Sequence, residues 1–123
     1  MITRSPRIVH KPWGHEEIFA ITDRYVGKIL CITAGEALSL QYHEHKEETL
    51  RILDGSLEVQ AGPAVGELAS YLLKPGDVFH IHPRLLHRMI AISDCRLLEV
   101  STAELDDVVR LEDRYGREGT TAP

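Results

Sequence analysis

The chain contains 123 residues, a length that suits a single domain with its own hydrophobic core. Its hydrophobic fraction of 43% and its charged fraction of 27% are ordinary for a globular protein. A formal net charge of −5 at pH 7 argues against a nucleic-acid partner. Every apolar run is shorter than the roughly 20 residues that cross a bilayer, and the N-terminus lacks the apolar segment of a secretory signal. We therefore expect a cytoplasmic protein without a membrane partner.

In chain order, short apolar segments alternate with turn residues, which predicts a mostly β protein. Turn chemistry is clearest at Asp54-Gly55, a strong hairpin signal, and at Lys74-Pro75-Gly76-Asp77. Short antiparallel strands at this spacing favour an all-β closed barrel or jelly roll, because closure removes exposed strand edges. The predicted strands are Glu17–Ile21, Tyr25–Ile32, Ala37–His43, Glu48–Asp54, Ser56–Ala61, Ala69–Leu73, Val78–Ile81, His87–Ile92 and Arg96–Ser101.

The segment after the last predicted strand has the pattern of a short helix. Ser101-Thr102-Ala103-Glu104 has the features of a helix N-cap with an acidic first turn. Apolar residues follow at partial helical spacing, namely Leu105, Val108, Val109 and Leu111. Two glycines, Gly116 and Gly119, end the pattern, and we expect residues 120–123 to be a frayed tail. The sequence thus predicts one domain over 1–123, with a barrel over about 17–101 and a helical segment over about 102–115.

The two cysteines, Cys31 and Cys95, each lie in an apolar strand-like segment and form no Cys-x-x-Cys motif. In a cytoplasmic protein, isolated cysteines of this kind are expected to be reduced thiols in the core. We therefore expect neither a disulfide framework nor a thiolate metal site.

Potential metal ligands are concentrated around residues 41–48. Gln41, His43 and His45 occupy alternate positions, and alternate residues of a strand project from the same face. The Glu48 carboxylate lies a short distance beyond them, and a lone histidine, His87, follows much later in the chain. Imidazole and carboxylate groups bind zinc, nickel, iron or manganese, whereas a carboxamide oxygen is a weak donor that favours harder ions. The pattern predicts that a β-barrel presents several donors to one divalent metal.

The spacing around these donors resembles the first motif of the cupin superfamily. Five residues separate Gly35 from Gln41, four separate His43 from Glu48, and six separate Glu48 from Gly55. Gln41 takes the place of the first histidine of the motif. The resemblance implies a jelly-roll barrel with a metal site in its interior.

The second cupin motif is matched less closely. Gly76 and His87 keep their places, whereas His82, Arg84 and Ala91 replace the usual Pro, Gly and Asn. The resemblance implies one of two ligand sets, in which either Gln41 or His45 joins the three residues shared by both, namely His43, Glu48 and His87. Zinc is the expected metal, and nickel, manganese and iron are the alternatives.

Three further segments resemble the C-terminal cupin domain of type II mannose-6-phosphate isomerases: Lys11-Pro12-Trp13-Gly14, the run Leu38–His43, and the tail Leu111–Arg117. This resemblance covers nearly the whole chain. It implies the interconversion of mannose 6-phosphate and fructose 6-phosphate, an aldose–ketose isomerisation that moves a proton between C1 and C2. Such chemistry needs a general base, electrophilic help at the sugar oxygens and a cationic group that holds the phosphate.

Several residues are candidates for these roles, although each could also be an ordinary solvated or hydrogen-bonded residue. For proton transfer the candidates are Lys28, His80 and His82. For the phosphate they are three arginines at helical spacing, Arg110, Arg114 and Arg117, since guanidinium groups suit phosphate oxygens. Two other functions stay open: a non-catalytic sugar- or metabolite-binding cupin and an iron-dependent cupin dioxygenase. We also expect a homodimer, because a small cupin exposes sheet faces and edges.

Overall fold

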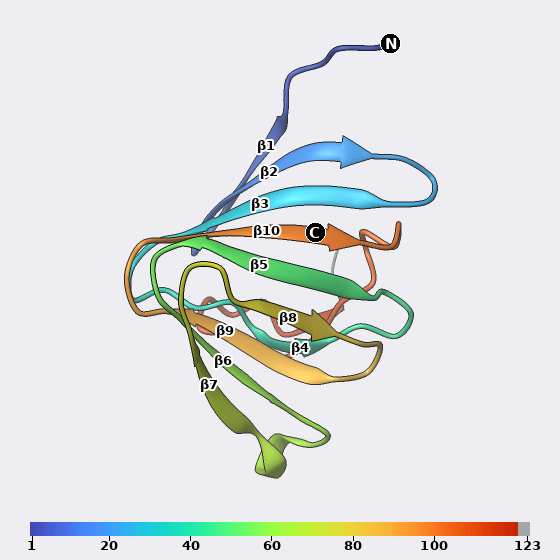
Figure 1. The fold of residues 1–123 in the computed structure, drawn as a ribbon. Helices are drawn as coiled ribbons and strands as arrows, with labels where there is room; N and C mark the ends of the chain where they lie inside the picture. The colour runs from blue at the N-terminus through green and yellow to red at the C-terminus, as the bar shows by residue number, and fades with distance from the viewer. Residues whose placement is uncertain (121–123) are drawn as a thin grey trace.

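The computed structural model describes residues 1–120, which form two antiparallel sheets packed face to face (Figure 1). Within these residues each sheet has six strands, in the orders β1-β2-β3-β10-β5-β8 and β12-β11-β4-β9-β6-β7. One short 3-10 turn, η1, spans Val65–Glu67. The strands are β1 Arg7–Lys11, β2 Gly14–Ile21, β3 Val26–Ile32, β4 Leu40–Tyr42, β5 Glu48–Asp54, β6 Leu57–Gly62, β7 Ala69–Leu73, β8 Val78–Ile81, β9 Leu86–Ala91, β10 Cys95–Ser101, β11 Val109–Glu112 and β12 Gly119–Thr120.

The hydrophobic core lies between the two sheets and is built by alternation along each strand. In β5, for example, Glu48, Leu50 and Ile52 are buried, while the residues between them are more exposed. Leu57 of β6 and Leu97 of β10 are fully buried in the same cluster, so residues of both sheets meet there. This alternation confirms the predicted all-β barrel and places the Glu48 carboxylate at one end of the apolar interior.

The turn predicted at Asp54-Gly55 forms, but it is not a hairpin. Gly55 has φ +81, and a Cβ there would lie 2.2 Å from the carbonyl oxygen of Asp94, so the position requires glycine. The strands that it joins belong to different sheets, because β5 pairs with β8 and β10 whereas β6 pairs with β7 and β9. The turn therefore carries the chain from one sheet to the other.

The helix expected over 102–115 was predicted wrongly, and a strand takes its place. Residues Val109–Glu112 form β11, which pairs with β4 through Val109↔Tyr42 and Arg110↔Gln41. An exposed edge of β4 needs a hydrogen-bonding partner, and this tertiary requirement outweighs a weak helical pattern. The expected frayed tail starts with Thr120, which pairs with β11, and its remaining residues 121–123 lie outside the described part of the chain.

The N-terminal residues add a hairpin that the strand predictions omitted. Strand β1 pairs with β2, and Pro12-Trp13 forms the turn between them. This turn places Trp13 in the core cluster, where its side chain is 3% exposed. Among residues 1–120, the structure has no helix long and apolar enough to cross a membrane.

Candidate metal centre and adjoining cationic pocket

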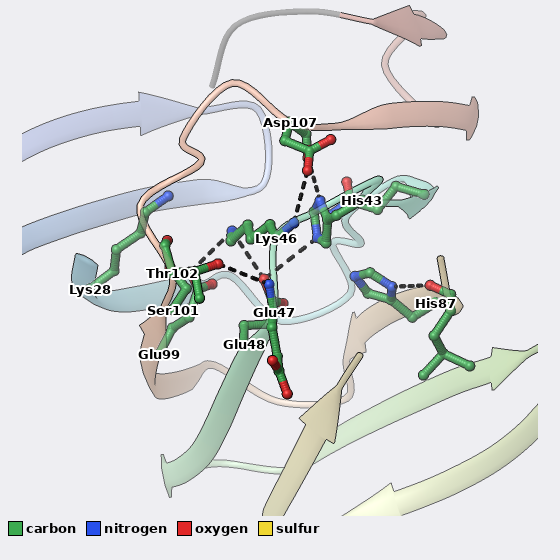
Figure 2. A network of polar contacts seen from close by, with 12 residues as sticks. Lys28, His43, Lys46, Glu47, Glu48, His87, Glu99, Ser101, Thr102 and Asp107 are labelled. Carbon is green, nitrogen blue, oxygen red and sulfur yellow. Dashed lines mark hydrogen bonds and ion pairs between the residues drawn. The ribbon is translucent and has the colours of Figure 1, made fainter. Parts of the chain in front are cut away.

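Three of the predicted ligands meet inside the barrel. His43 follows β4, Glu48 opens β5, and His87 lies in β9, where it pairs with Gln41 across the ladder. One donor atom from each of the three residues lies within 4.8 Å of the others, and the side chains are only 1–3% exposed. Figure 2 shows the two imidazoles and the carboxylate pointing toward a common region. The structure therefore assembles the His43–Glu48–His87 group that both predicted ligand sets share.

Backbone carbonyls orient the two imidazoles. His43 Nδ1 lies 2.6 Å from the carbonyl oxygen of Asp107, and His87 Nδ1 lies 2.9 Å from that of Leu85. A carbonyl oxygen only accepts, so each Nδ1 carries the proton and donates. Each Nε2 is then left with a free lone pair, as a metal ligand requires.

The donor atoms themselves fit a divalent cation. His43 Nε2 and His87 Nε2 are buried and make no hydrogen bond within the described chain, although polar atoms in a protein interior normally find partners, and Glu48 Oε2 beside them is paired with the Lys46 ammonium at 3.0 Å. Burial lowers the pKa of His43 to about 4 and also lowers the pKa of His87, so both rings are neutral at physiological pH. Two neutral imidazoles and one carboxylate form a ligand set suited to zinc and to other transition metals.

A buried lysine lies beside this group. Lys46 Nζ is 3.0 Å from Glu48 Oε2 and 3.2 Å from Glu99 Oε2, and all three side chains are buried (Figure 2). Burial acts to raise the pKa of Glu48, but the Lys46 ammonium, aided by the imidazoles, holds it below its ordinary value. Burial and the nearby Glu48 raise the pKa of Glu99. The ammonium therefore balances two carboxylates that would otherwise repel each other.

Asp107 fixes the loop that carries these residues. Its carboxylate accepts hydrogen bonds from the backbone N–H groups of Glu44, His45 and Lys46, at 2.9, 2.6 and 2.8 Å. Burial acts to raise the pKa of Asp107, but these three donors outweigh it and hold the pKa below its ordinary value. Because the Asp107 carbonyl also orients His43, this one residue sets both the loop and a candidate ligand.

The structure places the two alternative ligands differently. The predicted strand Ala37–His43 ends at Tyr42, so residues 43–47 form a loop and the strand alternation stops before His45. His45 is exposed and is not part of the His43–Glu48–His87 group, whereas Gln41 lies in the wall of the pocket that His43 also lines. Gln41 Oε1 accepts a hydrogen bond of 2.7 Å from Ser39 Oγ. Of the two, Gln41 has the position adjoining the candidate centre.

A small solvent-open pocket of about 60 Å³ adjoins the candidate centre, and cationic side chains predominate in its wall. His43, Gln41 and Lys46 form the side next to the metal ligands. The other charged or polar lining residues are Lys11, Glu16, Lys28, Ser39, Asp107, Arg110 and Arg117. Five lysines and arginines thus face two carboxylates, an imbalance that favours an anionic ligand.

Arg110 is a buried cation with donor atoms that the described residues leave unsatisfied. Its side chain is 7% exposed, and its Nε and Nη1 atoms have no hydrogen-bond partner within residues 1–120. Burial lowers the pKa of Arg110, and the nearby Arg117 acts in the same direction. Burial likewise lowers the pKa of Lys11, where Arg110 and Arg117 also contribute. An anion bound here would satisfy the Arg110 donors and reduce the repulsion among the cations.

The three arginines predicted from helical spacing do not share one face. Arg110 and Arg117 both line the cationic pocket, and Asp113 holds the Arg117 guanidinium at 2.9 and 3.1 Å. Arg114 instead donates to the carbonyl oxygen of Gly35 and lines a different hollow, with Arg88 and Glu112. The strand and turns that replace the predicted helix account for this separation.

Of the three candidates for proton transfer, only Lys28 lies in the pocket. Its Nζ is 3.3 Å from Glu16 Oε2, and both side chains are buried. His80 is exposed and bonds Glu47 at 2.6 Å, and the exposed His82 lies 2.8 Å from the carbonyl oxygen of Pro83. Neither histidine belongs to the pocket wall or to the His43–Glu48–His87 group.

Sequence reasoning did not identify five residues that shape this region, namely Lys11, Glu16, Lys46, Glu99 and Asp107. They come from strands and loops far apart in the chain. The available signal was weak: Glu99 is a charged residue at a position that alternation assigns to the interior, whereas Lys46 lies in a loop where no alternation applies. Only the register between strands shows that they meet.

Two packed antiparallel sheets that enclose a His/Glu/His group define the fold class of the cupins. An RmlC-like cupin from Shewanella frigidimarina has a similar structure, with a TM-score of 0.69 and 14% identity over 80% of this chain and 84% of that one. The chain belongs to the mannose-6-phosphate isomerase C-terminal family, whose profile matches residues 2–113. The structural similarity confirms the expected fold, and the profile match confirms the family resemblance drawn from the motifs.

Curated relatives agree with this membership. The xanthan biosynthesis protein XanB of Xanthomonas campestris is 32% identical over 116 residues, and the mannose-1-phosphate guanylyltransferase ManC of Salmonella typhimurium is 33% identical over 116 residues. Each match covers 90% of this chain but only 24% and 23% of the respective relative. The chain therefore spans about a quarter of the length of these relatives.

Proposed function

We propose that this chain is a metal-dependent sugar-phosphate isomerase that interconverts mannose 6-phosphate and fructose 6-phosphate. The observation that carries the proposal is the cationic pocket, in which the buried Arg110 lies in the same wall as His43 of the candidate metal centre, with its Nε and Nη1 atoms unsatisfied among residues 1–120. A phosphate-binding end and a metal-binding end in one pocket suit a phosphorylated sugar. The family name supports the same reaction.

The metal would be held by His43, Glu48 and His87, with the Gln41 carboxamide as the fourth protein ligand. Zinc is the metal we expect, with nickel, manganese and iron as alternatives. When bound, a divalent cation polarises a sugar oxygen and so stabilises the negative charge of the enediol. The hydrogen bonds to Asp107 and Leu85 hold both imidazoles in the tautomer that this role needs.

The phosphate would bind to Arg110, Arg117 and Lys11. Arg110 offers two guanidinium nitrogens that have no partner in the described part of the chain, and charge-assisted hydrogen bonds from guanidinium to phosphate are strong. Asp113 holds the Arg117 guanidinium in place through two hydrogen bonds. This assignment keeps two of the three arginines proposed from the sequence and adds a lysine from β1.

Proton transfer between C1 and C2 would fall to the Glu16–Lys28 pair. Glu16 Oε1 is buried in the pocket wall and has no hydrogen-bond partner within the described residues, whereas Oε2 pairs with Lys28. A carboxylate with one free oxygen can accept a proton from carbon and return it. Lys28, proposed from the sequence, would orient Glu16 and supply positive charge near the sugar oxygens.

One observation favours a second candidate, a non-catalytic cupin that binds a sugar phosphate. Lys46 Nζ lies 3.0 Å from Glu48 Oε2 and thereby provides a cation at the candidate metal ligand. A protein in which this ammonium replaces the metal would still bind an anion in the cationic pocket but would lack the electrophile. The two candidates therefore differ in turnover and agree in ligand binding.

A coupled assay with mannose 6-phosphate, run with zinc, nickel, manganese and iron in turn, tests the proposal. We expect turnover with at least one metal, and we expect Arg110→Gln to raise KM, with Arg51→Gln as an exposed control. Glu16→Gln should lower kcat and leave KM nearly unchanged. Saturable binding of mannose 6-phosphate without turnover under any of these metals would reject the isomerase and support the second candidate.

The homodimer is also retained as a proposal. Large apolar side chains such as Ile8, Phe19 and Val100 are 46–52% exposed on the sheet that contains β1, β2 and β10. Sedimentation equilibrium of the purified chain should give twice the monomer mass of 13.9 kDa. A monomeric mass at all accessible concentrations would reject it.

A further inference from the structure

A second group of potential metal ligands lies away from the cationic pocket. His15 and Glu17 come from β2 and Cys31 comes from β3, and one donor atom from each lies within 4.8 Å of the others. His15 and Cys31 are direct partners across the ladder, and Glu17 follows His15 on the same face two residues later. The three side chains are half-buried, unlike the fully buried group inside the barrel.

The surroundings leave these donors accessible. His15 and Cys31 line a surface hollow of about 410 Å³. His15 Nε2 lies 3.6 Å from Glu17 Oε1, which is longer than a good hydrogen bond. Arg96 of β10 is the partner of Cys31 on the other side of β3. Its guanidinium is 2.7 Å from the Asp54 carboxylate and so is directed to Asp54 and not to Glu17. The ring of His10 on β1 adjoins that of His15, with centroids 6.4 Å apart.

We propose that His15, Glu17 and Cys31 form a second site for a divalent transition metal of the zinc, cobalt or nickel type. An imidazole, a carboxylate and a thiolate are all ligands that zinc takes in proteins. Three protein ligands on a surface leave a coordination position open to water or to the neighbouring His10. The site does not depend on the proposed isomerase function, because it shares no residue with the cationic pocket.

The thiol is the ligand that distinguishes this site. Burial raises the pKa of Cys31, and Glu17 adds to the effect, so the thiol is protonated at neutral pH in the metal-free protein. A bound divalent cation reverses this preference, because a coordinating thiol loses its proton to the solvent as the metal–sulfur bond forms. The sequence predicted no thiolate site, since the spacing of cysteines alone shows neither the β2–β3 register nor the histidine opposite Cys31.

Titration of the reduced, metal-free chain with cobalt chloride tests the proposal. Cobalt bound to a thiolate gives a charge-transfer absorption in the near ultraviolet, which the nitrogen and oxygen ligands of the interior site cannot produce. We expect this band in the wild-type chain, its loss in Cys31→Ser, and its retention in Cys95→Ala and in His87→Ala. His15→Ala should weaken cobalt binding by more than the ~10–100-fold typical of losing a residue outside the coordination sphere.

A second readout keeps the test independent of spectroscopy. Zinc should slow the alkylation of Cys31 by iodoacetamide in the wild-type chain and should have no such effect in His15→Ala. Circular dichroism should show that Cys31→Ser and His15→Ala remain folded, because these two side chains are half-exposed, and it must also show that Cys95→Ala and His87→Ala, at buried positions, keep the fold. The proposal is overturned if the wild-type chain gives no thiolate band, if the band survives in Cys31→Ser, or if zinc protects Cys31 equally in His15→Ala.

Discussion

Replacement of Lys46 by methionine would remove the cation between two buried carboxylates. Lys46 Nζ pairs with Glu48 at 3.0 Å and with Glu99 at 3.2 Å, and the three side chains are 2–8% exposed. At an effective dielectric constant of about 20, opposite charges at such a distance attract by ~5 kcal/mol before desolvation is counted. Methionine keeps most of the side-chain volume, so the change acts mainly on charge.

The variant should lose ~3–5 kcal/mol of unfolding free energy at pH 7, the usual cost of leaving a buried charge without its partner. A chain of this length has ~6–18 kcal/mol in total, so the variant should still fold. Urea denaturation of the metal-free protein would measure the loss. Lys74→Met, at an exposed position, is the matched control and should change the free energy by less than about 0.5 kcal/mol.

The loss of unfolding free energy in Lys46→Met should become smaller as the pH falls. Without the ammonium, the pKa values of Glu48 and Glu99 in the folded state rise above the ordinary value of 4.5. At a pH between 4.5 and the raised pKa values, the folded variant binds more protons than the unfolded variant. The stability of the variant therefore decreases as the pH increases through this range. Added zinc should also restore stability at pH 7, since it places a new cation beside Glu48. An equal loss at pH 5 and pH 7, with no effect of zinc, would refute the reasoning.

Two further predictions concern the residues around the candidate centre. Burial lowers the pKa of His43 from 6.5 to about 4, so between these two pH values only the unfolded chain binds the proton. The stability of the metal-free chain should therefore fall as the pH drops from 6.5 to about 4. His43→Gln should flatten the profile of urea midpoint against pH, and an unchanged slope would contradict this account. Asp107→Asn should weaken zinc binding ~10-fold in a chelator competition, because it disturbs the hydrogen bonds that hold the loop. Asp106→Asn, at an exposed position, is the control and should leave the zinc affinity unchanged. Equal zinc affinities of Asp107→Asn and the wild-type chain would exclude a positioning role for Asp107.

The barrel and the core of the candidate site could be predicted because both depend on local pattern. Alternation identified most strands, and the spacing of donors around Gly35, Gly55 and Gly76 selected His43, Glu48 and His87, which the structure brings together. The uncertain fourth ligand depended on where the strand ends. Since β4 stops at Tyr42, His45 leaves the alternating face and becomes exposed.

The rest depended on pairing between distant segments, which a single sequence does not show. Arg110 looked like one of three arginines on a helix, but β4 recruits it into a strand opposite Gln41 and turns its side chain inward. Glu16 and Lys28 meet only because β2 pairs with β3. In the same way, Cys31 is not a core thiol, because the register places it on the outer side of its sheet opposite His15.

The hydrogen bonds from residues 44–46 to Asp107 also bear on the order in which the protein assembles. The candidate ligands His43 and Glu48 are synthesised early, but the residue that fixes their loop is made about 60 positions later. Contacts of such high sequence separation form late, because the closing of long loops carries an entropic cost. A growing chain that ends before residue 107 would therefore present its histidines on an unsupported loop. Tight metal binding at this centre would then report that the C-terminal segment has docked.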